Sequence, residues 1–248
     1  MTKDLEFLKN AVKEASMLIT DEFQVKSKGG YGDLVTNFEF EIEKFIIDKI
    51  NKEYPNFTII SEEFNKDAKL TENCFTIDPI DGTINFANGL PLWGIQVALI
   101  KNSKTVAAVI YLPKLNEFYC ADESGAYLND KKIKVNDKLK PSQCLYVIEG
   151  KKRTRATERM ISHRSHARWI GSAAVDYSWV ASGKFGGTIF RNESAWDYVP
   201  GMYICKQAGA YTYDEECCHI AACNKEFADI LKKDATYRKE DGEEIFSF

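Results

Sequence analysis

Two aspartates, three positions apart, lie in the part of this sequence with the greatest potential for chemistry. Asp78 and Asp81 enclose Pro79 and Ile80, directly after the β-rich run 74–77. Because proline restricts the turn, both carboxylates can converge on one point, which the carbonyl of Ile80 can also face. Such oxygen ligands suit a hard divalent cation, and Mg²⁺ keeps waters that a substrate can replace. The alternative is an ordinary loop, since Asp-Pro and Asp-Gly dipeptides are common turn formers.

The next two residues, Gly82 and Thr83, add a candidate site for an anion. Their backbone N–H groups lie at a turn, where such groups can bind a phosphate oxygen beside a cation. The sequence therefore predicts that a metal ion and a phosphate group share one site.

Further carboxylates occur at two other points in the chain. Glu62 and Glu63 follow the β-rich run 57–61, and strands that end together commonly present their last residues to one crevice. Asp197 follows Trp196 at the expected start of a helix. Each has a simpler alternative, because Glu62-Glu63 also fits a solvated strand end and Asp197 a favourable charge at a helix N-terminus.

The pattern of apolar residues predicts the elements that carry these side chains. Steps of three and four predict a helix between Leu5 and Ile19, and Thr36 with Glu39 forms a capping box for a second helix that stops before Pro55. Three further helices are expected at 172–182, at 196–209 with Pro200 in its first turn or at a kink, and at 225–232. Strands are expected at 57–61, 74–78, 93–101, 105–112, 210–213 and 220–222, with a hairpin across residues 102 and 103.

This order of elements predicts an α+β or layered α/β architecture with two closely packed lobes. We expect an N-terminal α+β lobe, residues 1–145, to carry the main metal-binding motif. A C-terminal α/β lobe, residues 146–248, would complete the site and the substrate pocket.

Composition excludes several classes of protein. The 248 residues include 37 acidic and 33 basic ones, and a net charge of −4 gives no bulk attraction to nucleic acids or anionic membranes. No apolar run approaches the roughly 18 residues of a membrane span, and the first residues lack the features of a signal peptide. Seven scattered cysteines favour a reducing compartment, so we expect a cytoplasmic protein. A zinc site around Cys217-Cys218-His219 and Cys223 is disfavoured, because no paired cysteine spacing accompanies it.

Taken in order, these motifs resemble the inositol monophosphatase family, within the larger group of lithium-sensitive, magnesium-dependent phosphatases. The resemblance rests on Glu62-Glu63, the segment 78–83 and Trp196-Asp197, with supporting segments at 33–36 and 171–174. It implies a five-layered α-β-α-β-α sandwich, commonly a homodimer, that hydrolyses a small phosphorylated polyol or sugar such as inositol 1-phosphate. Fructose 1,6-bisphosphate, histidinol phosphate and 3′-phosphoadenosine 5′-phosphate are the alternative substrates within this group.

The resemblance also implies roles for individual residues. The first Mg²⁺ would be held by Glu62, Asp78 and the Ile80 carbonyl, the second by Asp78, Asp81 and Asp197, and a third, loosely, partly by Glu62, with Mn²⁺ as an alternative metal. One ion would activate a water and the other would stabilise the departing alkoxide, in a site where Glu62, Thr83 and Glu39 are the catalytic residues. Substrate contacts would come from Gly82, Thr83, Gly171, Ser172, Arg191 and Asp197.

Two positions depart from the family pattern. The partner of the threonine is usually an aspartate and is here Glu39, one methylene longer, so that a catalytic role and a capping role both stay open. Seven residues before Asp197, where a glutamate holds sugar hydroxyls in animal relatives, this chain has Phe190. Arg191 could then meet a second anionic group, and Glu193 could replace the missing acid after a small shift of the loop.

Basic residues between Arg153 and Arg168 fit either a solvated helix face or a surface that collects phosphorylated substrates. Lys28 matches a family lysine that adds positive potential near the metal loop. Since some bacterial relatives also contact the transcription machinery, a regulatory binding protein that retains the fold is the alternative from a different functional class.

Overall fold

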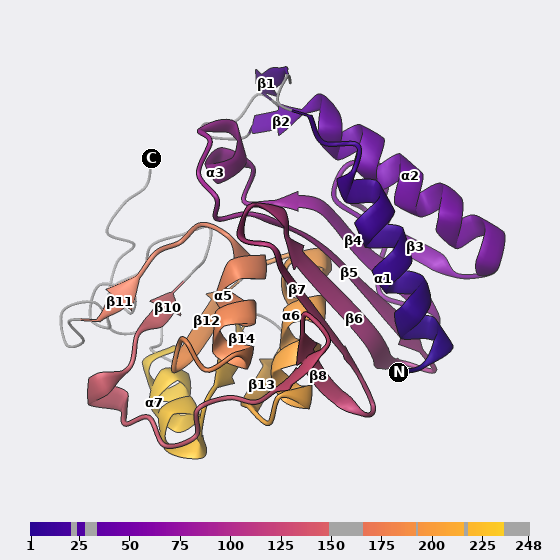
Figure 1. The fold of residues 1–248 in the computed structure, drawn as a ribbon. Coiled ribbons are helices and arrows are strands. Elements are labelled where there is room, and N and C mark those ends of the chain that lie inside the picture. Colours follow the sequence, from indigo (N-terminus) through magenta and orange to yellow (C-terminus); the bar gives the residue numbers. More distant parts are fainter. Residues whose placement is uncertain (21–23, 28–33, 149–165, 192, 216–217, 236–248) are drawn as a thin grey trace.

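A computed structural model describes residues 1–20, 24–27, 34–148, 166–191, 193–215 and 218–235. Within them the elements form five layers (Figure 1): two helices, a large mixed sheet, two further helices, a smaller sheet and a final helix. The predicted five-layered α-β-α-β-α architecture is therefore confirmed. No helix in the described parts of the chain has both the length and the apolar character needed to cross a bilayer.

The first layer consists of α1 (Lys3–Ser16) and α2 (Asn37–Glu53), which lie on one face of the large sheet (Figure 1). The apolar stripe predicted for the first helix is the face that α1 buries, including Leu5, Leu8 and Val12. As predicted, α2 begins after the N-cap Thr36 and ends before Pro55. It is the helix that brings Glu39 and Glu43, one turn apart, beneath the sheet edge where the acidic residues gather.

Seven described strands form the large sheet, in sequence order from one edge to the other. They are β3 (Thr58–Ser61), β4 (Cys74–Asp81), β5 (Gly94–Lys101), β6 (Lys104–Leu112), β7 (Glu117–Asp122), β8 (Gly125–Leu128) and β9 (Lys131–Ile133). Among these seven strands only the pair β3 and β4 is parallel, so that both end at the same edge, as the sequence predicted for Glu62 and Asp78. The predicted hairpin across Asn102 and Ser103 is present, with φ of 50° and 61° at these residues.

Strand β4 differs from the prediction in an informative way. The sequence predicted a strand that ends at Asp78 and then a turn, but β4 continues to Asp81 with a register shift against β5. Asp78 pairs with Gln96 and Asp81 with Gly94, so β4 has one residue more than β5 between these pairs. In a regular strand, residues three apart point to opposite faces, and the extra residue of a bulge corrects this. The bulge therefore lets both aspartates face the site.

The layers beyond the large sheet contain α5 (Ala173–Ala181) and α6 (Ala195–Gln207), then a five-stranded sheet and α7 (Lys225–Ala235). The small sheet has the order β11 (Ala167–Arg168), β10 (Tyr146–Ile148), β12 (Gly187–Arg191), β14 (Cys218–Ala222) and β13 (Tyr211–Glu215). Pro200 lies inside α6, beyond the first turn in which the sequence offered to place it. The remaining elements are β1 (Val25–Ser27), β2 (Leu34–Thr36), α3 (Thr83–Ala87) and the 3-10 turns η1 (Pro113–Leu115) and η2 (Pro141–Gln143).

Both faces of the large sheet are buried, which explains the nearly continuous apolar sequences of β5 and β6. Val97 and Leu99 pack in the cluster under α1 and α2, whereas Ala98 and Ile100 belong to the cluster shared with the small sheet. The sheet is thus a central layer. On its opposite face α6 packs against β3 and β4, and α5 packs against β5 and β6 and reaches the end of β4 with its first residues.

Candidate active site

Three carboxylates from two elements meet at the end of β4. Asp78 and Asp81 come from the bulged end of that strand, and Asp197 comes from the first turn of α6. One oxygen of each lies within 4.8 Å of the others, and this is the one such group of potential metal ligands found among the described residues. Asp78 and Asp81 are buried, and Asp197 is partly exposed. The β5 residue Gln96 donates through Nε2 to the Asp197 carbonyl at 3.4 Å and so ties α6 to the sheet.

The N-terminus of α5 binds the carboxylate of Asp81. The backbone N–H groups of Ala173 and Ala174 donate to its two oxygens at 3.1 and 2.8 Å, and the Ser172 hydroxyl donates to Oδ2. Ser172 is also the N-cap of α5, since its Oγ accepts from the Val175 N–H at 3.3 Å. The segment predicted to contact substrate thus stands next to the metal-binding motif, with Ser172 bonded directly to it.

The position of Asp197 fits both of the alternatives that the sequence left open. Its Oδ2 accepts a hydrogen bond of 2.9 Å from the Ser194 N–H, which completes a capping box at the start of α6. The same side chain contributes an oxygen to the carboxylate cluster. The Asp197 side chain can therefore cap α6 and belong to the carboxylate cluster at the same time.

The carboxylates in this cluster carry like charges that repel one another. Burial raises the pKa of Asp78 well above its usual range, and the charges of Glu62, Asp81 and Asp197 raise it further. Burial likewise raises the pKa of Asp81 to about 6, although three hydrogen bonds from the start of α5 act in the opposite direction. Carboxylates held together in this way can all be ionised only if a cation balances their charge, and otherwise some of them bind protons. The donor set consists entirely of oxygen atoms, which fits Mg²⁺ or another hard divalent ion.

Glu62 lies beside this group without belonging to it. It follows β3 directly, is half-buried, and its charge is the largest single charge acting on the pKa of Asp78. The Ile80 carbonyl, also predicted as a ligand, accepts a hydrogen bond from the Thr83 hydroxyl at 3.2 Å. The structure therefore brings Glu62 and the Ile80 carbonyl to the same edge as the three aspartates.

Glu39 and Thr83 are in direct contact. The Thr83 hydroxyl donates to Oε1 of Glu39 at 2.8 Å, while Oε2 of Glu39 accepts from the Thr36 N–H. The longer side chain thus reaches the threonine and caps α2 at the same time, so its capping contact is compatible with the catalytic role that the sequence left open. Glu39 is fully buried, and burial raises its pKa to about 7.

The turn at Gly82 connects β4 to α3. Gly82 has a φ of +86°, and a Cβ at this position would lie 3.1 Å from the Leu92 carbonyl oxygen and 3.1 Å from the Ser172 Cβ. Asn85 then donates through Nδ2 to the Leu92 carbonyl at 2.7 Å and to the Ile170 carbonyl at 2.9 Å. No role for Asn85 was predicted from the sequence, yet its bond to the residue before Gly171 holds two site segments together.

Phe190, which stands where animal relatives have a hydroxyl-binding glutamate, does not line the acidic site. Phe190 is 3% exposed and stacks on Tyr177 of α5, with ring centroids 4.8 Å apart, inside the core. It lies in β12, a strand that was not predicted from the sequence, and its side chain lies on the face of that strand that packs against α5. Glu193 lies near the cluster instead, since its charge is the largest charge raising the pKa of Asp197. Arg191, at the end of β12, is half-buried.

Other predicted features lie elsewhere. Lys28, Cys217 and the basic residues from Arg153 to Arg164 fall outside the described residues. His219 contacts Asp214 through Nδ1 at 2.8 Å, and in the described part of the chain it forms no metal-ligand group with cysteines.

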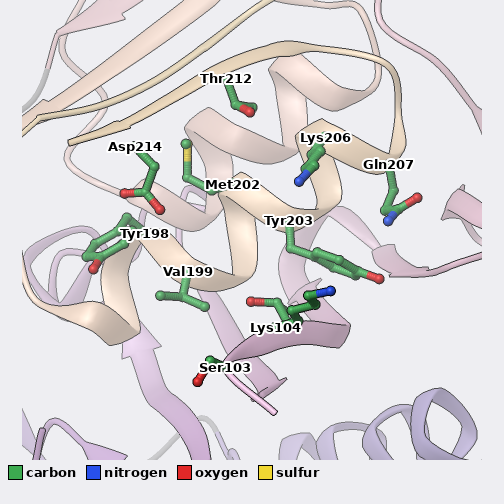
Figure 2. A pocket seen from close by; sticks show the side chains of 11 residues that line it. Ser103, Lys104, Tyr198, Val199, Met202, Tyr203, Lys206, Gln207, Thr212 and Asp214 are labelled. Carbon is green, nitrogen blue, oxygen red and sulfur yellow. The ribbon is translucent and has the colours of Figure 1, made fainter. Parts of the chain in front are cut away.

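A separate pocket of about 480 Å³ runs along α6, between its outer face, the β5–β6 hairpin and β13 (Figure 2). Tyr198, Tyr203 and Lys206 of α6 and Lys104 of β6 contribute to its lining. None of the candidate metal-binding or catalytic residues lines it, so we place the chemistry at the acidic cluster.

Comparisons with known proteins agree with this geometry. The family model described as "Inositol monophosphatase family" matches residues 1–238. The "Fructose-1,6-bisphosphatase/inositol-1-monophosphatase" of Thermotoga maritima is 35% identical over 199 residues, which cover 77% of this chain and 75% of the relative. The "Nus factor SuhB" of Pasteurella multocida is 33% identical over 204 residues, covering 78% and 76%.

The fold is also that of a solved relative. The structure of a Thermotoga maritima IMPase has a TM-score of 0.85 to this chain at 28% identity, and the match covers 97% of this chain and 100% of that one. The match to the family model spans all the site residues described above. The chain therefore belongs to the inositol monophosphatase family and is a phosphatase that hydrolyses phosphate monoesters.

Proposed function

We propose that this phosphatase is magnesium-dependent and acts on a small phosphorylated polyol or sugar of the inositol 1-phosphate kind. The observation that carries the proposal is the convergence of Asp78, Asp81 and Asp197, with Glu62 beside them, at one edge of the large sheet. Buried carboxylates without a cation would repel one another, and a phosphate ester would meet the same repulsion.

The ligand set that we propose follows the geometry. Glu62, Asp78 and the Ile80 carbonyl would hold one Mg²⁺, and Asp78, Asp81 and Asp197 would hold a second. When bound, these ions supply Lewis-acid stabilisation of the phosphate charge and lower the pKa of a coordinated water.

Proton transfer would fall to Glu39 and Thr83. With its pKa raised to about 7, Glu39 can accept a proton near neutral pH, and the Thr83 hydroxyl donates to it at 2.8 Å. With its proton directed to Glu39, the Thr83 hydroxyl could accept a hydrogen bond from a water in the site. The backbone N–H groups of Gly82 and Thr83 at the β4–α3 turn would then bind phosphate oxygens.

The substrate preference rests on Glu193. Because Phe190 lies in the core, the acid that would bind the substrate hydroxyls is Glu193, close to Asp197. A carboxylate at this place favours a polyol over a second phosphate group, which it would repel. The competing possibility is a bisphosphate, supported by the double name of the Thermotoga relative and by the position of Arg191 at the end of β12.

A phosphate-release panel tests this function. Inositol 1-phosphate, fructose 1,6-bisphosphate, histidinol phosphate and 3′-phosphoadenosine 5′-phosphate would be compared in Mg²⁺, Mn²⁺ and EDTA. We expect the highest kcat/KM for inositol 1-phosphate, no release in EDTA, and a loss of about tenfold for this substrate alone in Glu193→Gln. A preference for a bisphosphate that Glu193→Gln leaves unchanged would overturn the substrate assignment, and release in EDTA would overturn metal dependence.

A second candidate function comes from the relatives named "Nus factor SuhB". Such a chain would act by binding a macromolecule and would need no turnover. If the purified protein binds a macromolecular partner but releases no phosphate from any substrate of the panel in Mg²⁺, this function replaces the first.

A further inference from the structure

One buried carboxylate near the site has no part in the chemistry proposed above. Glu43 lies on α2 one turn after Glu39, and its side chain is fully buried. A buried charge is costly unless hydrogen bonds satisfy it, so its partners indicate what it is for.

The hydrogen bonds described for Glu43 go to the chain around Glu62. Its Oε2 accepts from the Glu63 N–H at 2.9 Å, and its Oε1 accepts from the Phe64 N–H at 2.8 Å. The Ser61 side chain hydrogen-bonds to the same carboxylate. One carboxylate thus binds the residue before Glu62 and the two residues after it.

The chain leaves the large sheet at this point. Strand β3 ends at Ser61, and residues 62–64 have bent, irregular backbone. Without Glu43, the N–H groups of Glu63 and Phe64 would turn to water, and the direction of the Glu62 side chain would vary with the backbone. Asn65 donates through Nδ2 to the Ser61 Oγ at 3.1 Å, which closes the same turn from its other end.

We propose that Glu43 is a positioning residue that fixes the backbone on both sides of Glu62 and so sets the affinity of the acidic cluster for Mg²⁺. The inference rests on the proposed function, because it takes Glu62 to be a metal ligand. The two buried glutamates of α2 then have different roles. Glu39 contacts the catalytic hydroxyl of Thr83, and Glu43 holds the backbone of the metal-binding segment around Glu62.

The central test compares Glu43→Gln with Glu41→Gln. Both replace a carboxylate on α2 by an amide of the same size, but Glu41 is exposed and bonds only to Asn37 on the same helix among the contacts described. The N–H groups of Glu63 and Phe64 bond to different oxygens of Glu43, and in Glu43→Gln one of these oxygens becomes an NH₂ donor, so one N–H loses its acceptor at that position. We expect amide hydrogen exchange at Glu63 and Phe64 to become at least tenfold faster in this variant, with the rest of α2 unchanged.

Metal binding is measured on the same proteins by calorimetric titration with Mg²⁺. Residues that orient metal ligands typically contribute about 10–100-fold to affinity, and we expect a loss in this range for Glu43→Gln and none for Glu41→Gln. In phosphate release, the Mg²⁺ concentration for half-maximal rate should rise by the same factor while kcat at saturating Mg²⁺ recovers. Faster exchange with unchanged Mg²⁺ affinity would reduce Glu43 to a structural residue and overturn the proposal.

A second variant covers the case in which Glu43→Gln does not fold. Ser61→Ala removes one bond to the carboxylate without changing any charge, and we expect its Mg²⁺ affinity to fall about fivefold, the equivalent of one hydrogen bond. Unchanged affinity in Ser61→Ala, with faster exchange at neither Glu63 nor Phe64, would overturn the proposal. If the unaltered protein itself binds no Mg²⁺, the proposed function fails instead, so the two failures are distinguishable.

Discussion

At the scale of single residues, the site depends on side chains that serve two purposes at once. Glu39 caps α2 through the Thr36 N–H and accepts a hydrogen bond from Thr83. Asp197 caps α6 and supplies an oxygen to the carboxylate cluster. In both cases the start of a helix fixes the side chain, so that little conformational freedom is lost when substrate binds.

The Glu39–Thr83 pair should behave as one catalytic unit. We expect Glu39→Gln and Thr83→Ala each to lower kcat about 10²–10⁴-fold, because the threonine hydroxyl loses its proton acceptor or is itself removed. The double variant should be no slower than the slower single variant, since both changes disable the same step. Steady-state phosphate release at saturating Mg²⁺ measures all three proteins. Effects that multiply in the double variant would show that the residues act independently.

At the scale of elements, the bulge of β4 and the turn after it determine where the acidic residues point. Gly82 is placed at this turn with a positive φ and with backbone and side-chain atoms close on one side. Gly89, further along the chain, has a similar φ of +72°, but a Cβ added there would meet no atom within 4 Å. Comparing alanine substitutions at the two glycines therefore separates the cost of the left-handed backbone conformation from the cost of steric crowding.

We expect Gly82→Ala to destabilise the protein more than Gly89→Ala. The second change costs only the left-handed backbone conformation, about 1–2 kcal/mol, whereas the first also forces Ser172 or the Leu92 carbonyl to move. Urea unfolding of both variants measures the difference. Because Ser172 is bonded to Asp81, Gly82→Ala should also weaken Mg²⁺ binding. Equal destabilisation by the two changes would mean that the close contacts at Gly82 do not contribute to the free energy of unfolding.

The elements also show which parts of the fold a sequence can predict. Long amphipathic helices such as α1 and α2 carry their own periodic signal, and the hairpin at Asn102 carries its turn residues. Strand β12 has no such signal, since it is short and buried, so the sequence did not show that Phe190 belongs to the core. The β4 bulge depends on pairing with β5, which is a tertiary property.

The candidate site was predictable where its residues lie close together in the sequence, and not where they meet only in the folded protein. The segment 78–83 combines carboxylates, a proline and a glycine within a short stretch, so its chemistry is visible locally. Glu43 looks like one more charged residue of α2 in the sequence, and the proposal of a positioning role rests on its burial and its hydrogen bonds to Glu63 and Phe64. Contacts between residues so far apart in the chain leave no pattern in a single sequence.

At the scale of the whole molecule, the stability of the metal-free protein should decrease as the pH rises toward neutral. Burial raises the pKa of Glu39 to about 7 and that of Asp81 to about 6, and raises those of Asp78 and Asp197 above their usual range. A carboxyl group whose pKa is higher in the folded than in the unfolded protein binds more protons when folded. These groups therefore lower the free energy of unfolding as the pH rises from about 4 to about 7.

Mg²⁺ should offset this loss of stability, because it binds the ionised carboxylates and binds them only in the folded protein. We expect the rise in Tm on adding Mg²⁺ to be larger at about pH 7 than at about pH 5, since more of these carboxylates are ionised at the higher pH. Thermal unfolding in EDTA and in Mg²⁺ at both pH values measures it, with Ca²⁺ as a second divalent ion. A larger rise at the lower pH, or none at either, would contradict a carboxylate metal site.

The layers of the fold meet at this same site. Asp78 and Asp81 come from the large sheet, and Asp197 comes from a helix between the two sheets. The net charge of −4 therefore understates the local acidity, since Glu62 and the three aspartates alone carry four negative charges when ionised. We propose that this concentration of charge holds a metal ion on which the hydrolysis depends.

The most direct test of that claim is phosphate release by Asp81→Asn in Mg²⁺, beside Asp229→Asn as a control. Asp229 is an exposed residue of α7 that contacts Tyr213 and Lys225, far along the chain from the cluster. We predict that Asp81→Asn folds, as judged by amide exchange in the core strands, and loses about two orders of magnitude or more in kcat. Asp229→Asn should match the unaltered protein. Mg²⁺-dependent turnover in Asp81→Asn at a rate close to that of the control would contradict the claim.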